Sequence, residues 1–166
     1  VKWCKESRAV PGYENFVSFT TAMIVALLEA QQFNTAAESQ GLGCCYLGTT
    51  TYNAPQIAEV LHLPRLVVPV TTLTVGYPAE TPEQVDRLPL EAIVHHEQYS
   101  DYDGEAIRRL YAEKESLPVN RGFVAENGKE TLAQVFTDVR YTKADNEYFS
   151  RVWLDFIVAQ GFELPK

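Results

Sequence analysis

One long segment of small and apolar residues constrains the fold more than any other feature of this sequence. It reads "NFVSFTTAMIVALLEAQQFNTAAESQGLG", from Asn15 to Gly43, and its residues predict a helix. Apolar side chains cover most of the circumference of that helix, which is typical of a helix buried in the middle of a domain or at a subunit interface. Gly41 or Gly43 is expected to end it with a left-handed cap.

The rest of the chain predicts short strands and further helices. Residues 44–48 ("CCYLG") are expected to be extended. A second helix is expected to begin with a capping box at Asn53, with Pro55 in its first turn and Gln56 three residues after the cap, and to stop by Pro64. Residues rich in β-branched side chains predict strands, the first with a bulge or an edge at Pro69, over 66–78 and 90–99. Helical patterns cover 103–116, 129–140 and 142–161. In the last of these, Thr142 with Asp145 resembles a capping box, and Gly161 is expected to end the helix.

This pattern indicates an α+β fold with an unbalanced count of elements. About five helices are expected beside only two or three strands, and so few strands form a poor sheet by themselves. A strand as apolar as "LVVPVTTLTVG" needs neighbours in a sheet. We therefore expect that further strands come from a partner or from a part of the domain outside this sequence.

Length and composition narrow the class of protein. The 166 residues suit a single domain, 1–166, and the formal charge of -8 argues against nucleic acid as a partner. The richest apolar run, "AMIVALLEA", is interrupted by Glu29, Gln31 and Gln32, so no membrane span is expected. Three cysteines without a spaced framework favour a reduced, cytoplasmic protein, and no metal-binding spacing is present.

Two places in the sequence are candidates for ligand binding, and each has a structural alternative. The bend from Gly41 to Tyr52 carries glycines that let a backbone approach a ligand closely, but a helix cap followed by a buried strand explains it as well. Arg87 can fork onto a phosphate, or it can form a surface ion pair with Asp86 or Glu83. From spacing alone the structural alternative is favoured at both places.

Histidine and cysteine pairs give no catalytic site. His95 and His96 are neighbours in a predicted strand, so they face opposite sides, and we expect one at the surface and one packed. Cys44 and Cys45 have no basic neighbour to lower a thiol pKa, which favours buried apolar roles over redox chemistry. No catalytic side chain is predicted.

The order of the motifs resembles one known family. "AAESQGLGCCYLGTTTYN" is followed by "IAEVLHLPRLVVPVTTLTVGYPAETPEQVDRLPLEAIVHHEQY". This series is similar to the flavin-dependent nitroreductases, in the branch of the oxygen-insensitive nitroreductases and NADPH-flavin oxidoreductases. The resemblance covers about Leu27 to Tyr99 and, more weakly, the helices after it. This sequence does not contain the N-terminal region of the family, which carries further arginines for the cofactor phosphate.

The resemblance implies a nitroreductase-like mixed sheet flanked by helices, with the long helix central and buried, and with the N-terminal part of the fold absent. It implies a homodimer that binds FMN at its interface, with NAD(P)H as co-substrate. Hydride would pass from NAD(P)H to the flavin and then to a small-molecule acceptor: a nitroaromatic, a quinone or another flavin. A non-catalytic flavin-binding or interaction module is the alternative.

The resemblance also assigns cofactor-binding positions residue by residue. The family segment that lies along the isoalloxazine ring falls on Tyr46, Leu47, Gly48, Thr49 and Thr50. The arginine of an "RLP" motif, which contacts the FMN phosphate in the family, falls on Arg87.

The chain departs from the family pattern at three of its motif positions. The second glycine of the ring-binding segment is replaced by Thr49, and a family arginine linked to pyridine-nucleotide binding is replaced by Thr51. A lysine that often stands two residues before the phosphate-binding arginine is replaced by Val85, so Arg87 is the one clear cation for a phosphate.

Overall fold

The structure is a computed structural model, and it describes residues 1–164. The chain forms two compact units, one of Val1–Glu80 together with the segment from Glu147 onward, and one of Thr81–Asn146. The expectation of one domain over 1–166 stays a prediction.

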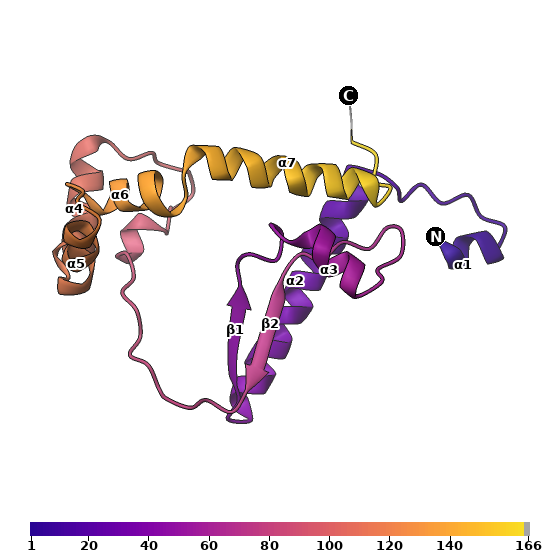
Figure 1. Cartoon of the computed structure of the whole chain (residues 1–166), viewed down its shortest axis with the longest axis horizontal. Coiled ribbons are helices and arrows are strands. Elements are labelled where there is room, and N and C mark those ends of the chain that lie inside the picture. Colours follow the sequence, from indigo (N-terminus) through magenta and orange to yellow (C-terminus); the bar gives the residue numbers. More distant parts are fainter. Residues whose placement is uncertain (165–166) are drawn as a thin grey trace. The chain divides into compact units, whose positions relative to one another are not determined.

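The first unit combines helices with one small sheet (Figure 1). Its elements are α1 (Lys2–Glu6), α2 (Phe16–Ser39), β1 (Gly43–Leu47), α3 (Ala54–Val60), β2 (Thr72–Gly76) and most of α7 (Lys143–Ala159). β1 and β2 pair antiparallel, from Gly43 opposite Gly76 to Leu47 opposite Thr72. The α+β class is confirmed, and the sheet in the described residues has these two strands.

A polar cap begins α2, and a glycine cap that the sequence predicts ends it. The side chain of Asn15 accepts a hydrogen bond from the Ser18 amide at 2.9 Å, which satisfies one free donor of the first turn. At the other end Gly41 takes φ +79°, and the amides of Gly41 and Leu42 donate to the carbonyls of Glu38 and Ala37. This is a Schellman cap, so Gly41 and not Gly43 ends the helix.

A small aromatic core joins α2 to α7. Phe19, Ile157 and Phe162 are buried together. The Phe19 ring lies 5.2 Å from the Phe162 ring and 6.0 Å from the Trp153 ring, both measured between centroids. Because Phe162 directly follows the cap at Gly161, the end of α7 is set by the same packing that anchors the start of α2.

Most of α2 is not buried within this chain, in contrast to the expectation of a central buried helix. Only Phe19 and Ala37 of this helix are buried, while Ile24, Leu28 and Phe33 are 54%, 67% and 53% exposed. The described residues therefore do not bury α2 as the central helix of a domain. The alternative, that α2 lies at a subunit interface, stays a prediction.

The apolarity of α2 also corrects the expectation that no segment of the sequence could span a membrane. The helix is long and apolar enough to cross a membrane by length and composition, because a mean over 18 residues tolerates the polar interruptions near Glu29. A single helix of this kind is weak evidence, since core helices of soluble proteins meet the same criterion.

The two predicted strands differ from the observed structure. The first observed strand is shorter than the predicted 66–78. Leu66 has φ +66° and donates its amide hydrogen to the Gln160 carbonyl, so strand pairing begins only at Thr72. The prediction of a strand over 90–99 is wrong. This segment contains the 3₁₀ turn η1 (Leu90–Ala92), where the amides of Ala92 and Val94 bond back to the carbonyls of Pro89 and Leu90.

The second unit is helical. Its helices are α4 (Gly104–Ser116), α5 (Pro118–Glu126), α6 (Leu132–Val135) and the π-helical turn η2 (Phe136–Arg140). Asp103 caps α4, and Thr131 with Gln134 forms a capping box on α6. The sequence analysis missed α5, although Pro118 at its first position is a recognised start signal.

The C-terminal cap of α7 predicts the cost of one substitution. Gly161 has φ +97°, and a Cβ at this position would overlap Nε of Arg65, which also forms a two-pronged ion pair with Glu14. We expect Gly161→Ala to destabilise the protein by about 1–2 kcal/mol, because backbone strain adds to the cost of moving the exposed Arg65 side chain off this ion pair. Urea unfolding measures the loss.

Gly128→Ala is the matched control. Gly128 also has a positive φ, +60°, but a Cβ there meets no heavy atom within 4 Å. This variant should lower the free energy of unfolding by only about 1 kcal/mol, because only the left-handed backbone conformation disfavours alanine there. Equal losses for the two variants would contradict the role assigned to Arg65.

Candidate functional site

The strand β1 carries the first predicted binding residues at its C-terminal end. The cap at Gly41 turns the chain back so that β1 runs beside α2, and Tyr46 Oη lies 3.5 Å from Oε1 of Gln31 on that helix. One edge of β1 pairs with β2, and among the described residues no strand pairs with the other edge. The last residues of β1 therefore lie on a strand that has one unpaired edge among the described residues.

The turn after β1 is locked by a buried hydroxyl. Thr50 is 4% exposed, and its Oγ1 lies 3.1 Å from the Leu47 carbonyl and 2.9 Å from Oγ1 of Thr72, the first residue of β2. These bonds close the end of the β1–β2 pair. Any contact of Thr50 with a ligand must therefore come from its backbone.

The same turn is tied to the start of α3. The Thr49 carbonyl accepts from the amides of Tyr52 and Asn53 and from Nδ2 of Asn53. Asn53 precedes α3 as predicted, but its side chain bonds back to Thr49 and caps no amide of the helix, which corrects the expected capping box with Gln56. The side chain fixes the turn instead of the helix.

An aromatic stack holds the turn from the other side. The ring of Tyr52 lies 4.2 Å from the ring of Phe149 on α7, with an interplanar angle of 10°. The sequence analysis did not single out either residue, and no local signal could have found a contact between segments so far apart in the chain. The turn is therefore positioned by β2, α3 and α7 together.

Four consecutive backbone amides in this turn, those of Gly48, Thr49, Thr50 and Thr51, donate no hydrogen bond of normal length and angle to an acceptor within the part of the chain that the structure describes. Backbone donors without partners need water or a ligand. We call these four amides the amide strip.

The surface beside the amide strip is open and largely apolar. Tyr46 and Leu47 are each 39% exposed, and a Cβ built on Gly48 meets no heavy atom within 4 Å. Gly48 has an ordinary negative φ, so the turn itself does not require glycine there. The absent side chain leaves room for close approach by a flat group.

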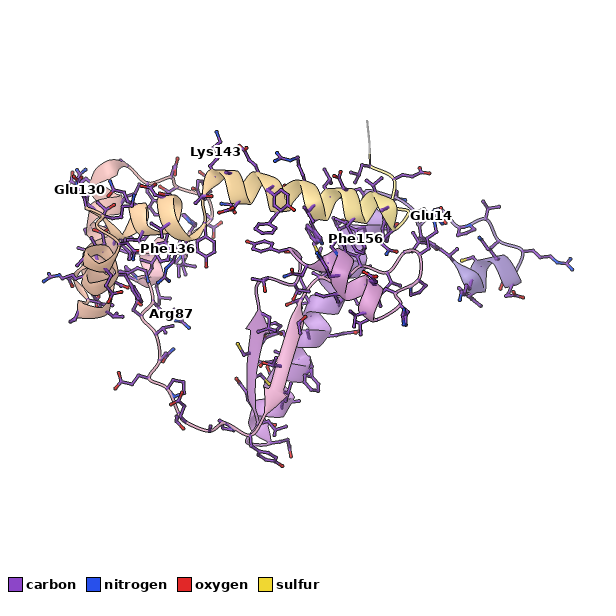
Figure 2. All side chains as sticks on the ribbon, viewed as in Figure 1. Glu14, Arg87, Glu130, Phe136, Lys143 and Phe156 are labelled. Carbon is purple, nitrogen blue, oxygen red and sulfur yellow. The ribbon has the colours of Figure 1, made fainter. Side chains whose placement is uncertain are left out.

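Arg87 lies in the second unit, on the extended segment between β2 and α4 (Figure 2). Its Nη1 donates to the carbonyls of Val85 and Asp86, both at 3.0 Å. The expected alternative, an ion pair with Asp86 or Glu83, is not formed among the described residues, because the Asp86 carboxylate is bound by Lys114 at 2.6 Å. The guanidinium thus keeps an uncompensated charge. The position of Arg87 as a phosphate ligand stays a prediction.

The histidine pair divides as predicted, although the strand that motivated the prediction does not exist. His96 is exposed, whereas His95 packs between the rings of Tyr99 and Tyr102. Nδ1 of His95 accepts from the Ser100 amide at 3.2 Å, and its Nε2 lies 3.2 Å from the Tyr102 hydroxyl. Both ring nitrogens therefore serve local structure.

Comparison with known proteins finds a family whose model matches part of this chain. Residues 12–77 match the model of the nitroreductase family, a stretch that contains α2, β1, the amide strip, α3 and β2. This part of the chain is similar to the nitroreductase family, and the resemblance predicted from the sequence is confirmed.

Individual relatives agree with this assignment. The chain is 40% identical over 87 residues to an FMN reductase (NADPH) of Bacillus subtilis, covering 52% of this chain and 35% of the relative. It is 39% identical over 88 residues to an oxygen-insensitive NADPH nitroreductase of Salmonella typhimurium, covering 53% of this chain and 37% of the relative. The chain thus spans about a third of the length of these two relatives.

A solved structure covers nearly the whole chain. The crystal structure of a protein from Bacteroides fragilis NCTC 9343 is 62% identical, with a TM-score of 0.95 over 97% of this chain and 65% of the crystallised chain. The fold described above is therefore shared with a larger protein.

The buried hydroxyl in the turn predicts a specific stability effect. Thr50→Val keeps the shape of the side chain but removes both hydrogen bonds and leaves the Thr72 hydroxyl without its partner. We expect a loss of about 1–2 kcal/mol in the free energy of unfolding. Chemical denaturation monitored by circular dichroism measures it.

Thr50→Ser is the control for this prediction. It keeps the hydroxyl and loses only a methyl group, so most of the stability should return. If Val and Ser variants are equally stable, the hydroxyl does not lock the turn.

Proposed function

We propose that the protein is an FMN-dependent oxidoreductase that uses NAD(P)H. The observation that supports this most is the amide strip, Gly48–Thr51, set in an open apolar surface within the nitroreductase-family segment. The relatives named FMN reductase (NADPH) and oxygen-insensitive NADPH nitroreductase point to the same chemistry.

The residues of the strip fit a flavin ring. A tricyclic ring system is flat and mostly apolar, so it needs close backbone approach and no bulky charged neighbour. Gly48 offers that approach, and Tyr46 and Leu47 offer partly exposed apolar surface beside it. The amides of the strip would donate to the electronegative edge of the ring, with Thr50 contributing its backbone alone.

Arg87 would hold the cofactor phosphate. A guanidinium that is bound only to backbone carbonyls can still present N–H donors to a phosphate oxygen. Val85 stands where the family often has a lysine, so Arg87 would carry most of the neutralisation within this chain.

When bound, FMN supplies the redox chemistry, taking a hydride from NAD(P)H and passing electrons to a nitroaromatic, quinone or flavin acceptor. The chain's contribution is to orient the ring and to place donors where negative charge develops on it. Fixed backbone donors cost no reorganisation at that moment, because β2, α3 and α7 already hold the turn. No acid or base side chain is assigned, since solvent can supply protons.

A second copy of the chain would cover α2. The exposed apolar residues Ile24, Leu28 and Phe33 lie on a helix that the described residues leave largely unburied. The homodimer that the family resemblance implies would bury this surface, and it would place the cofactor at the seam between the subunits. The acceptor remains a small molecule in this proposal.

The proposed cofactor site predicts that the purified protein binds FMN and oxidises NAD(P)H when a nitro compound or quinone is present. Flavin absorbance and NAD(P)H consumption measure these two properties. Gly48→Val should keep the fold, because a Cβ there meets open space, but should weaken flavin binding at least tenfold by blocking close approach to the strip.

Gly12→Val is the matched control, since a Cβ at Gly12 also meets no atom within 4 Å, and Gly12 belongs to the segment before α2 and not to the strip. It should leave flavin affinity unchanged. A protein that takes up no FMN contradicts the proposal. One that binds FMN without oxidising NAD(P)H supports the non-catalytic flavin-binding alternative.

The proposed dimer predicts the effect of one charge on α2. Leu28→Glu places a carboxylate in the surface that the second copy would cover, and burying an unpaired charge is strongly unfavourable. We expect this variant to be monomeric and to lose FMN, as measured by light scattering coupled to size-exclusion chromatography and by flavin content.

Val60→Glu is the control for this prediction. Val60 is 76% exposed, but it lies on α3, outside the α2 surface. This variant should remain dimeric. A Leu28→Glu protein that also remains dimeric and flavin-bound would exclude α2 as the seam.

A further inference from the structure

The second unit brings a lysine from α4 to the residue that precedes Arg87. Nζ of Lys114, in the last turn of α4, lies 2.6 Å from Oδ2 of Asp86, and both side chains are more than two-thirds buried. Such partial burial makes an ion pair stronger than a fully exposed one, because water screens it less. The pair therefore keeps the Asp86 carboxylate in place.

The Asp86 carboxylate is a natural competitor of a ligand phosphate for the Arg87 guanidinium. The two residues are adjacent in sequence, and the Arg87 guanidinium already donates to the Asp86 carbonyl at 3.0 Å. A free carboxylate this close would be an attractive bidentate partner for the guanidinium. Arg87 is nevertheless bound only to the carbonyls of Val85 and Asp86 among the described residues.

We propose that Lys114 is a positioning residue for phosphate recognition: by holding the Asp86 carboxylate, it keeps Arg87 available for the FMN phosphate. This inference rests on the proposed function. It assigns Lys114 no contact with the ligand. Its effect depends on Asp86 and is exerted through Arg87.

The alternative roles of Lys114 make different predictions. If Lys114 touched the phosphate itself, freeing it from Asp86 would tighten FMN binding. If it only stabilised α4, its loss would affect ligands with and without a phosphate equally. If it only neutralised charge near the site, its loss would matter just as much without Arg87.

The test compares FMN with riboflavin, which has the same ring system but no phosphate. Flavin fluorescence titrations of the purified protein measure the ratio of the two dissociation constants. Arg87→Gln should reduce the preference for FMN about tenfold or more, which is typical of losing a charge-assisted hydrogen bond. Lys114→Met should reduce it about two- to fivefold, as expected when an ion pair near the surface captures the guanidinium. Riboflavin affinity should not change in either variant.

Three further variants separate the mechanisms. Lys114→Met combined with Asp86→Asn should restore the FMN preference, because no carboxylate remains to capture Arg87. Lys114→Arg should retain the preference, because it keeps the pair with Asp86. Lys114→Met in the Arg87→Gln background should have no additional effect.

Lys129→Met is the matched control. Lys129 forms another lysine–aspartate pair in the same unit, with Asp138 at 3.0 Å. Its loss should not alter the FMN preference.

The outcomes distinguish this inference from the function on which it rests. If Arg87→Gln leaves the FMN preference unchanged, the proposed phosphate contact is wrong. If Arg87→Gln reduces the preference but Lys114→Met does not, only the role of Lys114 is overturned. An equal effect of Lys114→Met with and without Arg87, or no rescue by Asp86→Asn, also overturns it.

Discussion

The packing of Phe19 against Ile157 and Phe162 is the constraint on which the first unit depends. It joins the start of α2 to the end of α7, two segments from opposite ends of the chain. The ion pair of Arg65 with Glu14 and the hydrogen bond from the Leu66 amide to the Gln160 carbonyl reinforce the same junction. Hydrogen bonding to Arg65 also lowers the pKa of Glu14. This core is small beside the apolar surface of α2, so the first unit leaves much of that apolar surface exposed.

The candidate site follows from that junction. Once α7 is anchored, Phe149 can stack on Tyr52, while β2 supplies Thr72 to the Thr50 hydroxyl. The turn between β1 and α3 is thus held on several sides, while the amides of Gly48–Thr51 form no hydrogen bond of normal geometry among the described residues. A rigid turn with unused donors can hold the polar edge of a flat cofactor without rearrangement, which is the property that a redox cofactor site needs.

Sequence reasoning anticipated the parts of the site that depend on local rules. Gly41 ends α2, Thr142 with Asp145 begins α7, and Gly161 ends it, as their residue types predict. It failed where distant contacts compete with local preference. Residues 90–99 carry β-branched and aromatic side chains, but the amides of Ala92, Ile93 and Val94 find acceptors within a 3₁₀ turn, and the sheet of the described residues contains only β1 and β2. The pairing of Asp86 with Lys114 likewise could not be read from spacing, since the nearer partner in sequence was Arg87.

The sequence by itself determined the class of fold, the limits of the main helices and the family, because caps, apolar periodicity and the order of short motifs are local properties of the chain. The tertiary structure alone decided which groups are left over. It commits the Thr50 side chain to the fold, leaves the amides of Gly48–Thr51 unsatisfied, and gives Asp86 to Lys114 rather than to Arg87. Whether a donor or a charge is available to a ligand depends on every neighbour that folding brings to it, and those neighbours come from segments far away in sequence.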